Sequence, residues 1–355
     1  MRLHLPDGPA APGVFGEFFQ TGSFSGLPGR RRPAEIDSSD GQEGALTSPT
    51  STFGPPRFLI LGCGFTGTEV ARRAIAAGHR VVATTRQSDR RDALEKIGVE
   101  LHVERALTAD LVRRWVDPSV NVLVTFAPDG CTDASLGPAL GAAAHVVYVS
   151  STGVYGAQRG RIDETTPVDA VEPRARARLA AERSYRDIGA TIVRAAGIYG
   201  PGRGLHLRVQ SGTFRIPGDG ANIVSRIHVA DLARLILGIF RRAGEGSRAD
   251  NFVAADDTPV PQIEAIAWLC RRLGLPLPPC VPIDEAPATL RHDRAIDNQR
   301  IKSWTGLSLL YSGYREGFEA CLGEQSGSSA AANVNRPGSA VLPVETRPGS
   351  RPRSQ

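Results

Sequence analysis

Residues 57–86, RFLILGCGFTGTEVARRAIAAGHRVVATTR, join an apolar run, a glycine-rich turn, a helical pattern and a second apolar run. This order predicts a strand that begins near Phe58, a helix over residues 66–77 and a second strand that ends near Arg86. Two glycines, Gly62 and Gly64, lie between the first strand and the helical pattern, and a third, Gly67, lies in the first turn of that pattern. Such a strand–turn–helix–strand unit is typical of folds that bind phosphate groups at the start of the helix.

The three glycines have the spacing G-x-G-x-x-G of dinucleotide-binding folds. The first glycine permits a tight turn, the second lets the backbone approach a pyrophosphate, and the third lets the helix pack closely on the strand. Open amides and the positive end of the helix dipole would hold the pyrophosphate. The motif alone is weak evidence, but here it follows a strand and opens a helix. The predicted pyrophosphate site consists of Gly62, Cys63, Gly64, Phe65, Thr66 and Gly67.

The end of the second strand bears on the ribose of the dinucleotide. NAD sites usually place an acid there for the free hydroxyls, whereas an arginine nearby accommodates the 2′-phosphate of NADP. The strand here ends in Thr84, Thr85 and Arg86, and a guanidinium offers paired donors to a phosphate. We therefore predict NADP as the cofactor, while Asp89 keeps NAD open. The alternative interpretation is that Arg86 is a solvated loop residue.

Beyond residue 86, short apolar runs continue to alternate with helical patterns. The predicted helices cover residues 89–97, 109–115, 135–144 and 173–188. The predicted strands are VELHV, VNVLVTFA, HVVYVSS and ATIVRAAG. This alternation is typical of a parallel sheet with helices on both faces. The predicted fold class is α/β, a Rossmann-like doubly wound sheet of six parallel strands, and Ala127 at the end of VNVLVTFA belongs to the predicted cofactor site.

The pattern divides the chain into four parts. Residues 57–200 form the predicted NAD(P)-binding domain. Residues 201–322 are richer in loops and form a small substrate lobe, which also contributes part of the sheet. Residues 1–56 and 323–355 are rich in small and polar residues and lack sustained apolar periodicity, which predicts two disordered tails.

The composition of the 355-residue chain argues against several classes of protein. No apolar run approaches the ~20 residues that span a bilayer, and the N-terminus lacks the basic start and apolar core of a signal peptide. The cysteines and histidines are scattered without the spacing of a disulfide framework or a metal site. The charge of +5 comes with interleaved acidic residues, which argues against nucleic-acid binding.

We therefore expect a cytoplasmic protein without membrane, metal or nucleic-acid partners, whose partner is a small-molecule substrate. It would be a monomer or a homodimer.

Five motifs follow one another within residues 57–322: LILGCGFTG, VYVSSTGVYG, DETTP, IVRAAGIYGPGR and RIHVADLA. In this combination the chain resembles the extended short-chain dehydrogenases/reductases, the NAD-dependent epimerase/dehydratase family. The resemblance implies NAD or NADP bound across the strand ends and a catalytic Ser or Thr after the fifth strand. It implies an oxidoreductase or epimerase/dehydratase that acts on a small hydroxy, carbonyl or sugar-derived substrate.

The resemblance also assigns roles to individual residues. The catalytic hydroxyl corresponds to Ser151, with Thr152 as its neighbour; the alternative is that both merely end a strand and cap a turn. The family places the strand of RIHVADLA beside the substrate, so Arg226 and His228 are predicted substrate residues, with a core histidine as the alternative. Arg203 of YGPGR is likewise a predicted substrate residue.

Typical members of the family carry Tyr-x-x-x-Lys on the next helix, where the ammonium lowers the pKa of the tyrosine. With Glu182 as the anchor, the two positions fall on Arg174 and Arg178, and no lysine occurs between Lys96 and Lys302. The chain thus resembles the atypical branch of the family, which lacks this pair. Arg178 keeps a positive charge for the nicotinamide ribose or a substrate anion, but a guanidinium cannot replace a phenol as an acid.

If the protein is an enzyme, another acid must replace the missing tyrosine. Tyr155, Tyr185 and Tyr199 are the candidates, with core packing as the alternative for each, and an ordered water is a further candidate. The missing pair also leaves a second function open, a non-catalytic NADP(H)-binding sensor or scaffold.

Overall fold

The computed structural model describes residues 57–129, 131–169 and 171–334. The predicted tail over residues 1–56 lies outside them, as do residues 335–355 of the second tail. The described residues belong to one compact unit. Within the described residues, no helix combines the length and the apolar character that a membrane span needs.

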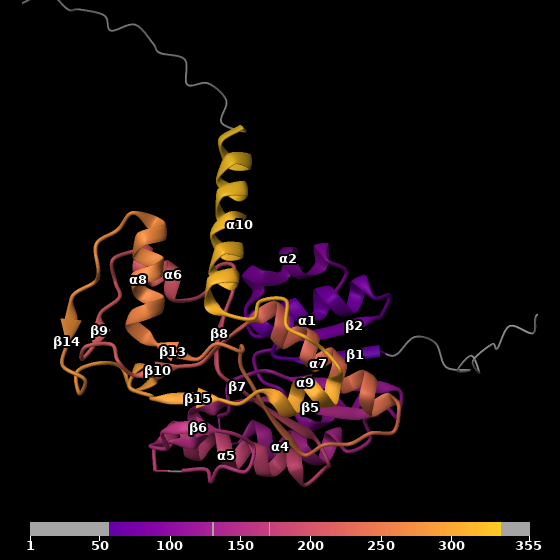
Figure 1. Cartoon of the computed structure of the whole chain (residues 1–355). Helices are drawn as coiled ribbons and strands as arrows, with labels where there is room; N and C mark the ends of the chain where they lie inside the picture. The colour runs from indigo at the N-terminus through magenta and orange to yellow at the C-terminus, as the bar shows by residue number, and fades with distance from the viewer. Residues whose placement is uncertain (1–56, 130, 170, 335–355) are drawn as a thin grey trace, which may run out of the picture. The chain divides into compact units, whose positions relative to one another are not determined.

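A seven-stranded parallel sheet forms the centre of this unit and confirms the predicted α/β class (Figure 1). The strand order is β12-β7-β5-β4-β1-β2-β3. The chain winds outward on both sides of the β4–β1 pair, as in a doubly wound fold. The strands are β1 (Arg57–Leu61), β2 (Val81–Thr85), β3 (Glu100–Val103), β4 (Val120–Val124), β5 (His145–Ser151), β7 (Thr191–Ala195) and β12 (Asn251–Ala254).

The prediction of six strands was wrong, because β12 adds a seventh. It pairs in parallel with β7, from Asn251 opposite Ile192 to Ala254 opposite Ala195. The sequence analysis assigned residues 201–322 to a loop-rich lobe and did not isolate the four residues of β12 within it. The parallel pairing covers the open edge of β7 and extends the sheet into the second half of the chain.

Helices cover both faces of the sheet, and each face has its own apolar core. One face packs against α1 (Phe65–Ala76), α2 (Arg91–Lys96), α7 (Val229–Gly244) and α9 (Gln299–Thr305). The other face packs against α3 (Ala109–Arg113), α4 (Thr132–Leu140) and α5 (Pro173–Arg186). The predicted helix over residues 89–97 is divided into a 3-10 turn, η1 (Ser88–Arg90), and the short α2.

The remaining elements are short and lie mostly in the second half of the chain. The helical ones are η2 (Thr152–Tyr155), α6 (Leu205–Gln210), α8 (Gln262–Leu273), η3 (Ala288–Leu290) and α10 (Tyr314–Val334). The strands are β6 (Gly160–Ile162), β8 (Gly197–Tyr199), β9 (Ile216–Pro217), β10 (Ile223–Val224), β11 (Arg226–His228), β13 (Val260–Pro261), β14 (Cys280–Val281) and β15 (Arg294–Ile296). They pair only in twos.

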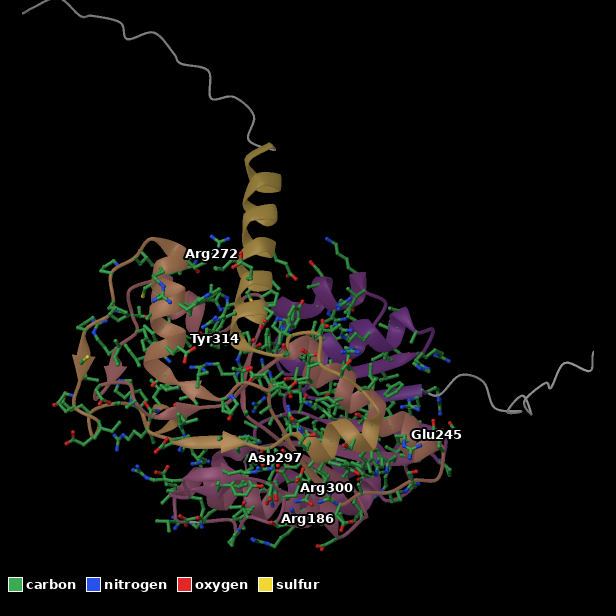
Figure 2. The ribbon with its side chains drawn as sticks, in the orientation of Figure 1. Arg186, Glu245, Arg272, Asp297, Arg300 and Tyr314 are labelled. Carbon is green, nitrogen blue, oxygen red and sulfur yellow. The ribbon has the colours of Figure 1, made fainter. Side chains whose placement is uncertain are left out.

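A separate apolar core joins several of these elements. Phe214, Leu269 and Phe318 are fully buried in it, and Arg272 of α8 pairs with Glu319 of α10 at 2.7 Å (Figure 2). This second core supports a substrate lobe, and we keep the boundary at residue 200 as a proposal.

α10 continues through Val334, past the predicted start of the second tail at residue 323, and the boundary of that tail stays a prediction. Buried residues of the first turns of α10, such as Phe318 and Cys321, fix the start of the helix. The following alanines have high helix propensity and prolong it.

Candidate cofactor and substrate site

The turn between β1 and α1 has the geometry expected of the first glycine. Gly62 has a φ of +81°, a conformation that favours glycine. A Cβ at this position would lie 2.6 Å from the Cβ and 2.8 Å from the backbone nitrogen of Phe126. The chain therefore needs glycine here both for its backbone conformation and for the close approach of the segment that follows β4.

The other two glycines differ in what surrounds them. A Cβ on Gly67 would meet Ile60 Cγ2 at 3.0 Å and Thr125 Oγ1 at 3.2 Å, so this residue lets α1 pack closely on the sheet. A Cβ on Gly64 would meet only two atoms, at 3.8 and 3.9 Å. Gly64 is also the N-cap of α1, and it has no side chain to cover the first amides. The loop thus leaves an exposed helix N-terminus that fits a pyrophosphate.

A cavity of about 370 Å³, which we call the glycine-loop cavity, adjoins this turn. Its lining brings together four predicted cofactor residues, Gly62, Gly64, Arg86 and Ala127. Two further arginines, Arg90 and Arg105, also line it, together with Glu104, Asp129, Thr84, Thr85, Gln87, Ala106, Leu107, Thr125, Phe126 and Thr132. Three guanidiniums beside an open helix N-terminus make this cavity suitable for a ligand with several phosphates.

Arg90 is a cavity residue that the sequence analysis missed. Its Nη1 lies 3.4 Å from the Cys63 carbonyl oxygen, and its Nη2 lies 3.4 Å from Thr68 Oγ1. The side chain therefore reaches from η1 to the glycine turn. Its one sequence signal was that it follows Arg86 closely in the segment after β2.

The remaining residues of the predicted pyrophosphate site have distinct surroundings. Thr66 is buried, and burial raises the pKa of the Cys63 thiol to about 11. Cys63 therefore remains a thiol at neutral pH, as befits a small packing residue of the turn. The ring of Phe65 lies 5.3 Å from the guanidinium carbon of Arg203. Arg203, predicted to bind the substrate, thus contacts the start of α1.

Ser151 ends β5 and lines a second cavity, of about 680 Å³, which we call the Ser151 cavity. Its Oγ accepts a hydrogen bond from the Gly153 amide at 3.0 Å and so caps η2. Because this oxygen acts as an acceptor there, its own proton remains free to be donated. The serine both caps a turn and presents a donor.

The Ser151 cavity also contains the two arginines at the positions of the missing pair, Arg174 and Arg178. Arg178 Nη1 lies 3.3 Å from the Val149 carbonyl oxygen and 3.5 Å from the Tyr148 hydroxyl. The other lining residues are Gly153, Glu172, Pro173, Ala175, Pro287, Ala288, Thr289 and His292. Thr152 follows Ser151 but is not part of this lining.

The tyrosines considered as replacement acids are buried and do not line either cavity. The Tyr155 hydroxyl donates to the Asp163 carbonyl oxygen at 2.9 Å and accepts from Arg194 Nη1 at 3.1 Å. The Tyr185 hydroxyl donates to Asp133 Oδ1 at 2.9 Å. Burial raises the pKa of both phenols and also that of Tyr199. We therefore do not retain Tyr155 as the acid.

A buried ion pair supports the end of β5. The Glu182 carboxylate of α5 is 0% exposed and accepts from Arg194 Nε at 3.1 Å and from Nη2 at 2.9 Å. Ser150 Oγ donates to the same carboxylate at 2.5 Å, and Arg186 reaches it at 2.8 Å (Figure 2). The network joins α5, β5 and β7, and it includes Ser150, the residue that precedes Ser151.

The two predicted substrate residues of β11 are buried. His228 Nδ1 accepts a hydrogen bond from the Ala230 amide at 3.2 Å and caps α7. Burial lowers the pKa of His228 to about 4, so the ring stays neutral. Arg226 is only 6% exposed, and neither residue lines the two cavities described so far. Both have surroundings typical of core residues, and a substrate role for them stays a prediction.

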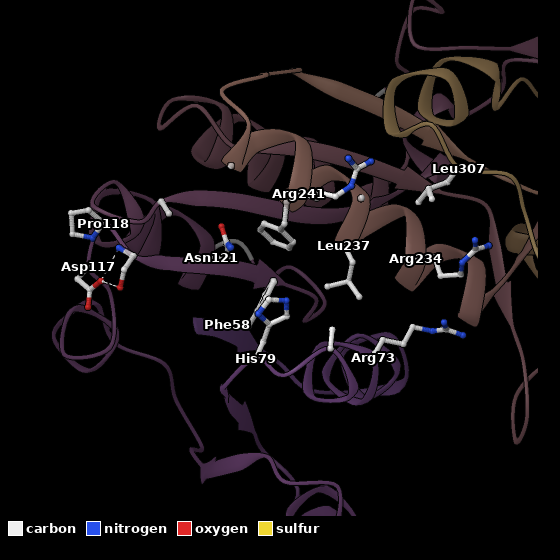
Figure 3. Close-up of a pocket in the computed structure, with 16 residues that line it drawn as sticks. Phe58, Arg73, His79, Asp117, Pro118, Asn121, Arg234, Leu237, Arg241 and Leu307 are labelled. Atoms are coloured by element: carbon white, nitrogen blue, oxygen red, sulfur yellow. Dashed lines mark hydrogen bonds between the residues drawn. The ribbon is translucent and has the colours of Figure 1, made fainter. Parts of the chain in front are cut away.

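A third and larger cavity, of about 1140 Å³, lies at the opposite ends of the strands. We call it the amino-end cavity (Figure 3). Phe58 at the start of β1 and Leu237 and Phe240 of α7 give it an apolar wall. Ala77, which ends α1, also lines it. A helix C-terminus presents carbonyl oxygens, so this end of α1 does not favour a phosphate.

Comparisons with known proteins agree with this architecture. Residues 135–255 match the model of the NAD dependent epimerase/dehydratase family. A 3-diazoavenalumate denitrifying reductase of Streptomyces sp is 29% identical over an alignment of 179 positions that covers 44% of this chain. The chain spans only 58% of the length of that reductase.

Two solved structures resemble nearly the whole described unit. A functionally unknown conserved protein from Silicibacter pomeroyi DSS is 30% identical, with a TM-score of 0.66, over 76% of this chain and 99% of its own. A putative NAD-dependent epimerase/dehydratase from Methylobacillus flagellatus is 26% identical, with a TM-score of 0.61, over 77% of this chain and 100% of its own. With its doubly wound sheet and glycine turn, the chain belongs to the NAD-dependent epimerase/dehydratase family.

Proposed function

We propose that the protein is an NAD(P)-dependent oxidoreductase or epimerase/dehydratase that acts on a small hydroxy, carbonyl or sugar-derived compound. One observation carries the proposal: the open glycine turn follows β1 and the Ser151 cavity follows β5, at the same edge of one parallel sheet. Ligands of open α/β sheets bind at this edge. The similarity to the Streptomyces reductase supports the oxidoreductase class.

The charges of the glycine-loop cavity support NADP as the preferred cofactor. Arg86, Arg90 and Arg105 line the cavity, whereas Asp89, the residue that kept NAD open, does not. An acid that would repel a 2′-phosphate is also missing from the end of β2, where Thr85 precedes Arg86. Two carboxylates, Glu104 and Asp129, also line the cavity, but the three guanidiniums outnumber them and favour a ribose that carries a phosphate.

A bound nicotinamide would supply hydride transfer to or from a substrate carbon. The chain's own residues would hold the reacting oxygen. Ser151 has a free hydroxyl proton to donate to a carbonyl or alkoxide oxygen, because its Oγ already accepts from Gly153. The positive charge of Arg178 in the same cavity favours negative charge on that oxygen. A guanidinium does not give up a proton in proteins, and a serine hydroxyl is not a general acid, so an ordered water would have to carry the proton.

The first experiment is a fluorescence titration of the protein with NADH and with NADPH. We expect both to bind and NADPH to bind more tightly. If neither NADH nor NADPH binds, the proposed function is wrong.

The second experiment measures turnover of a panel of sugars, aldehydes and ketones with the cofactor that binds. We expect Ser151→Ala to lower kcat by about 100-fold, the typical loss when one donor to a developing oxyanion is removed. Ser119→Ala, a matched serine change in the lining of the amino-end cavity, should leave kcat unchanged. Cofactor binding without any turnover would instead support the sensor or scaffold function.

A further inference from the structure

The Ser151 cavity contains one more hydrogen-bonding side chain, His292, from the loop before β15. This residue lies 141 positions after Ser151 in the chain, yet both line the same cavity. It also lines a smaller adjoining cavity of about 290 Å³. The half-buried ring therefore borders the space in which Ser151 would meet a substrate.

Arg294 determines which nitrogen of this ring carries the proton. Its Nη2 lies 2.6 Å from His292 Nδ1. A guanidinium has five N–H donors and no acceptor, and it does not lose its proton in proteins. Nδ1 must therefore accept, which leaves the proton of the neutral ring on Nε2. The Arg294–His292 contact thus converts the imidazole into a donor at Nε2.

Arg294 can impose this tautomer because its own position is fixed. It is only 3% exposed. Its guanidinium also donates to the carbonyl oxygens of Thr152, Gly156 and Gln158, the last at 3.1 Å. A single guanidinium therefore links the residue that follows Ser151 to the His292 ring.

The backbone of His292 is fixed as well. Asn222 Nδ2 donates to the His292 carbonyl oxygen at 2.8 Å, and the Ile223 amide donates to Asp293 Oδ1 at 2.8 Å. Burial and the charge of Arg294 together lower the pKa of His292 to about 4. The ring is therefore a neutral donor held in a fixed orientation.

We propose that His292 donates its Nε2–H to the same substrate oxygen that Ser151 binds, with Arg294 as the positioning residue that fixes the donor tautomer. This inference rests on the proposed function, because it requires a substrate oxygen in the Ser151 cavity. Ser151 and His292 would then form a pair of donors for a carbonyl or alkoxide oxygen. In typical members of the family, the resemblance implies a serine or threonine hydroxyl and a tyrosine hydroxyl instead.

The first test observes the ring of His292 in the wild-type protein and uses a variant only to assign its resonances. Nitrogen-15 NMR of protein labelled at histidine, in complex with NADPH, distinguishes protonated from unprotonated ring nitrogens. We expect the His292 resonances, assigned by their loss in His292→Gln, to show a protonated Nε2 and an unprotonated Nδ1. A protonated Nδ1 would overturn the proposal.

A second test uses the panel member with the highest turnover as the probe. His292→Phe keeps a planar ring but no donor, and we expect kcat to fall about 100-fold. His292→Gln places an amide N–H close to the position of Nε2 and should restore kcat to within about tenfold of the wild type. His79→Gln, in the lining of the amino-end cavity, serves as the control and should leave kcat unchanged.

The outcomes separate this inference from the proposed function. Undiminished turnover by His292→Phe overturns the role of His292 and leaves the proposed function intact. Absence of turnover from the wild type across the panel overturns both. A loss of kcat that Gln restores, together with a protonated Nε2, supports the donor role, because a purely structural role would not select for an N–H at that position.

Discussion

The two ends of the central sheet differ in what they offer to a ligand. The amino-end cavity is the larger, at about 1140 Å³, but the C-terminus of α1 and apolar side chains such as Phe58 and Leu237 line it. The glycine-loop cavity holds only about 370 Å³, and three arginines line each of the two cavities, but only the glycine-loop cavity adjoins the N-terminus of α1. The comparison teaches that the direction of the helix dipole and the open amides, rather than cavity size, indicate where a phosphate ligand binds.

The largest expected difference between the two ends concerns ion pairs. Glu182, 0% exposed, pairs with Arg194 beneath the end of β5, and loss of one partner of a buried pair costs about 3–5 kcal/mol. We expect Glu182→Gln to lower the free energy of unfolding by about 3 kcal/mol, measured by urea denaturation.

The matched pair at the amino ends of β1 and β4 is Arg57–Asp117, whose side chains are 42% and 45% exposed. Surface pairs contribute about 0–1 kcal/mol, so Asp117→Asn should change stability by less than about 1 kcal/mol. Equal losses for the two variants would show that the two ends do not differ in this respect.

The second prediction compares two glycines at opposite ends of α1. Gly62 and Gly78 have φ values of +81° and +85°, but only Gly62 has neighbours that a Cβ would meet. We expect Gly62→Ala to weaken cofactor binding by about 100-fold, or about 2.8 kcal/mol at 1.4 kcal/mol per factor of ten. The clash with Phe126 must displace the turn whose amides would hold the pyrophosphate in the proposed function.

Gly78→Ala should have a comparable backbone strain without any effect on the cofactor, because no atom lies within 4 Å of the added Cβ. Fluorescence titration measures the binding, and thermal denaturation measures the strain. Unchanged cofactor affinity in Gly62→Ala would refute the role of the turn.

The smallest of the three effects concerns the arginines at the two ends of β2. Arg86 follows the strand and lines the glycine-loop cavity, whereas Arg80 precedes it and pairs with Glu100 at 3.7 Å. We expect Arg86→Ala to weaken NADPH binding about tenfold, the effect of one charged hydrogen bond, and to leave NADH binding unchanged. Arg80→Ala should affect neither nucleotide. Equal weakening of both by Arg86→Ala would argue against a 2′-phosphate contact.

The elements that sequence alone could predict are those whose signal is local. The glycine spacing, the strand–helix alternation and the missing lysine all lie within short segments. The structure confirms the parallel sheet and gives Gly62, Gly64 and Gly67 the backbone conformation and surroundings that the motif requires. β12 escaped prediction because it lies in the loop-rich second half of the chain, outside the regular strand–helix alternation.

The candidate substrate site was less predictable, because its residues come from distant segments. Tyr155 follows Ser151 closely in the chain, yet its hydroxyl contacts Arg194 and the Asp163 carbonyl rather than a cavity. His292 had no sequence signal that distinguished it from the other histidines. Its significance depends on Arg294, whose four partners lie on two separate segments.

The sequence by itself determined the fold class and the position of the pyrophosphate turn, because backbone conformation and helix periodicity are properties of neighbouring residues. Only the tertiary structure decided which side chains share a cavity with Ser151, which arginines surround the glycine turn, and which nitrogen of His292 is the donor. Those properties depend on burial and on hydrogen bonds between segments more than 100 residues apart, and no local pattern encodes them.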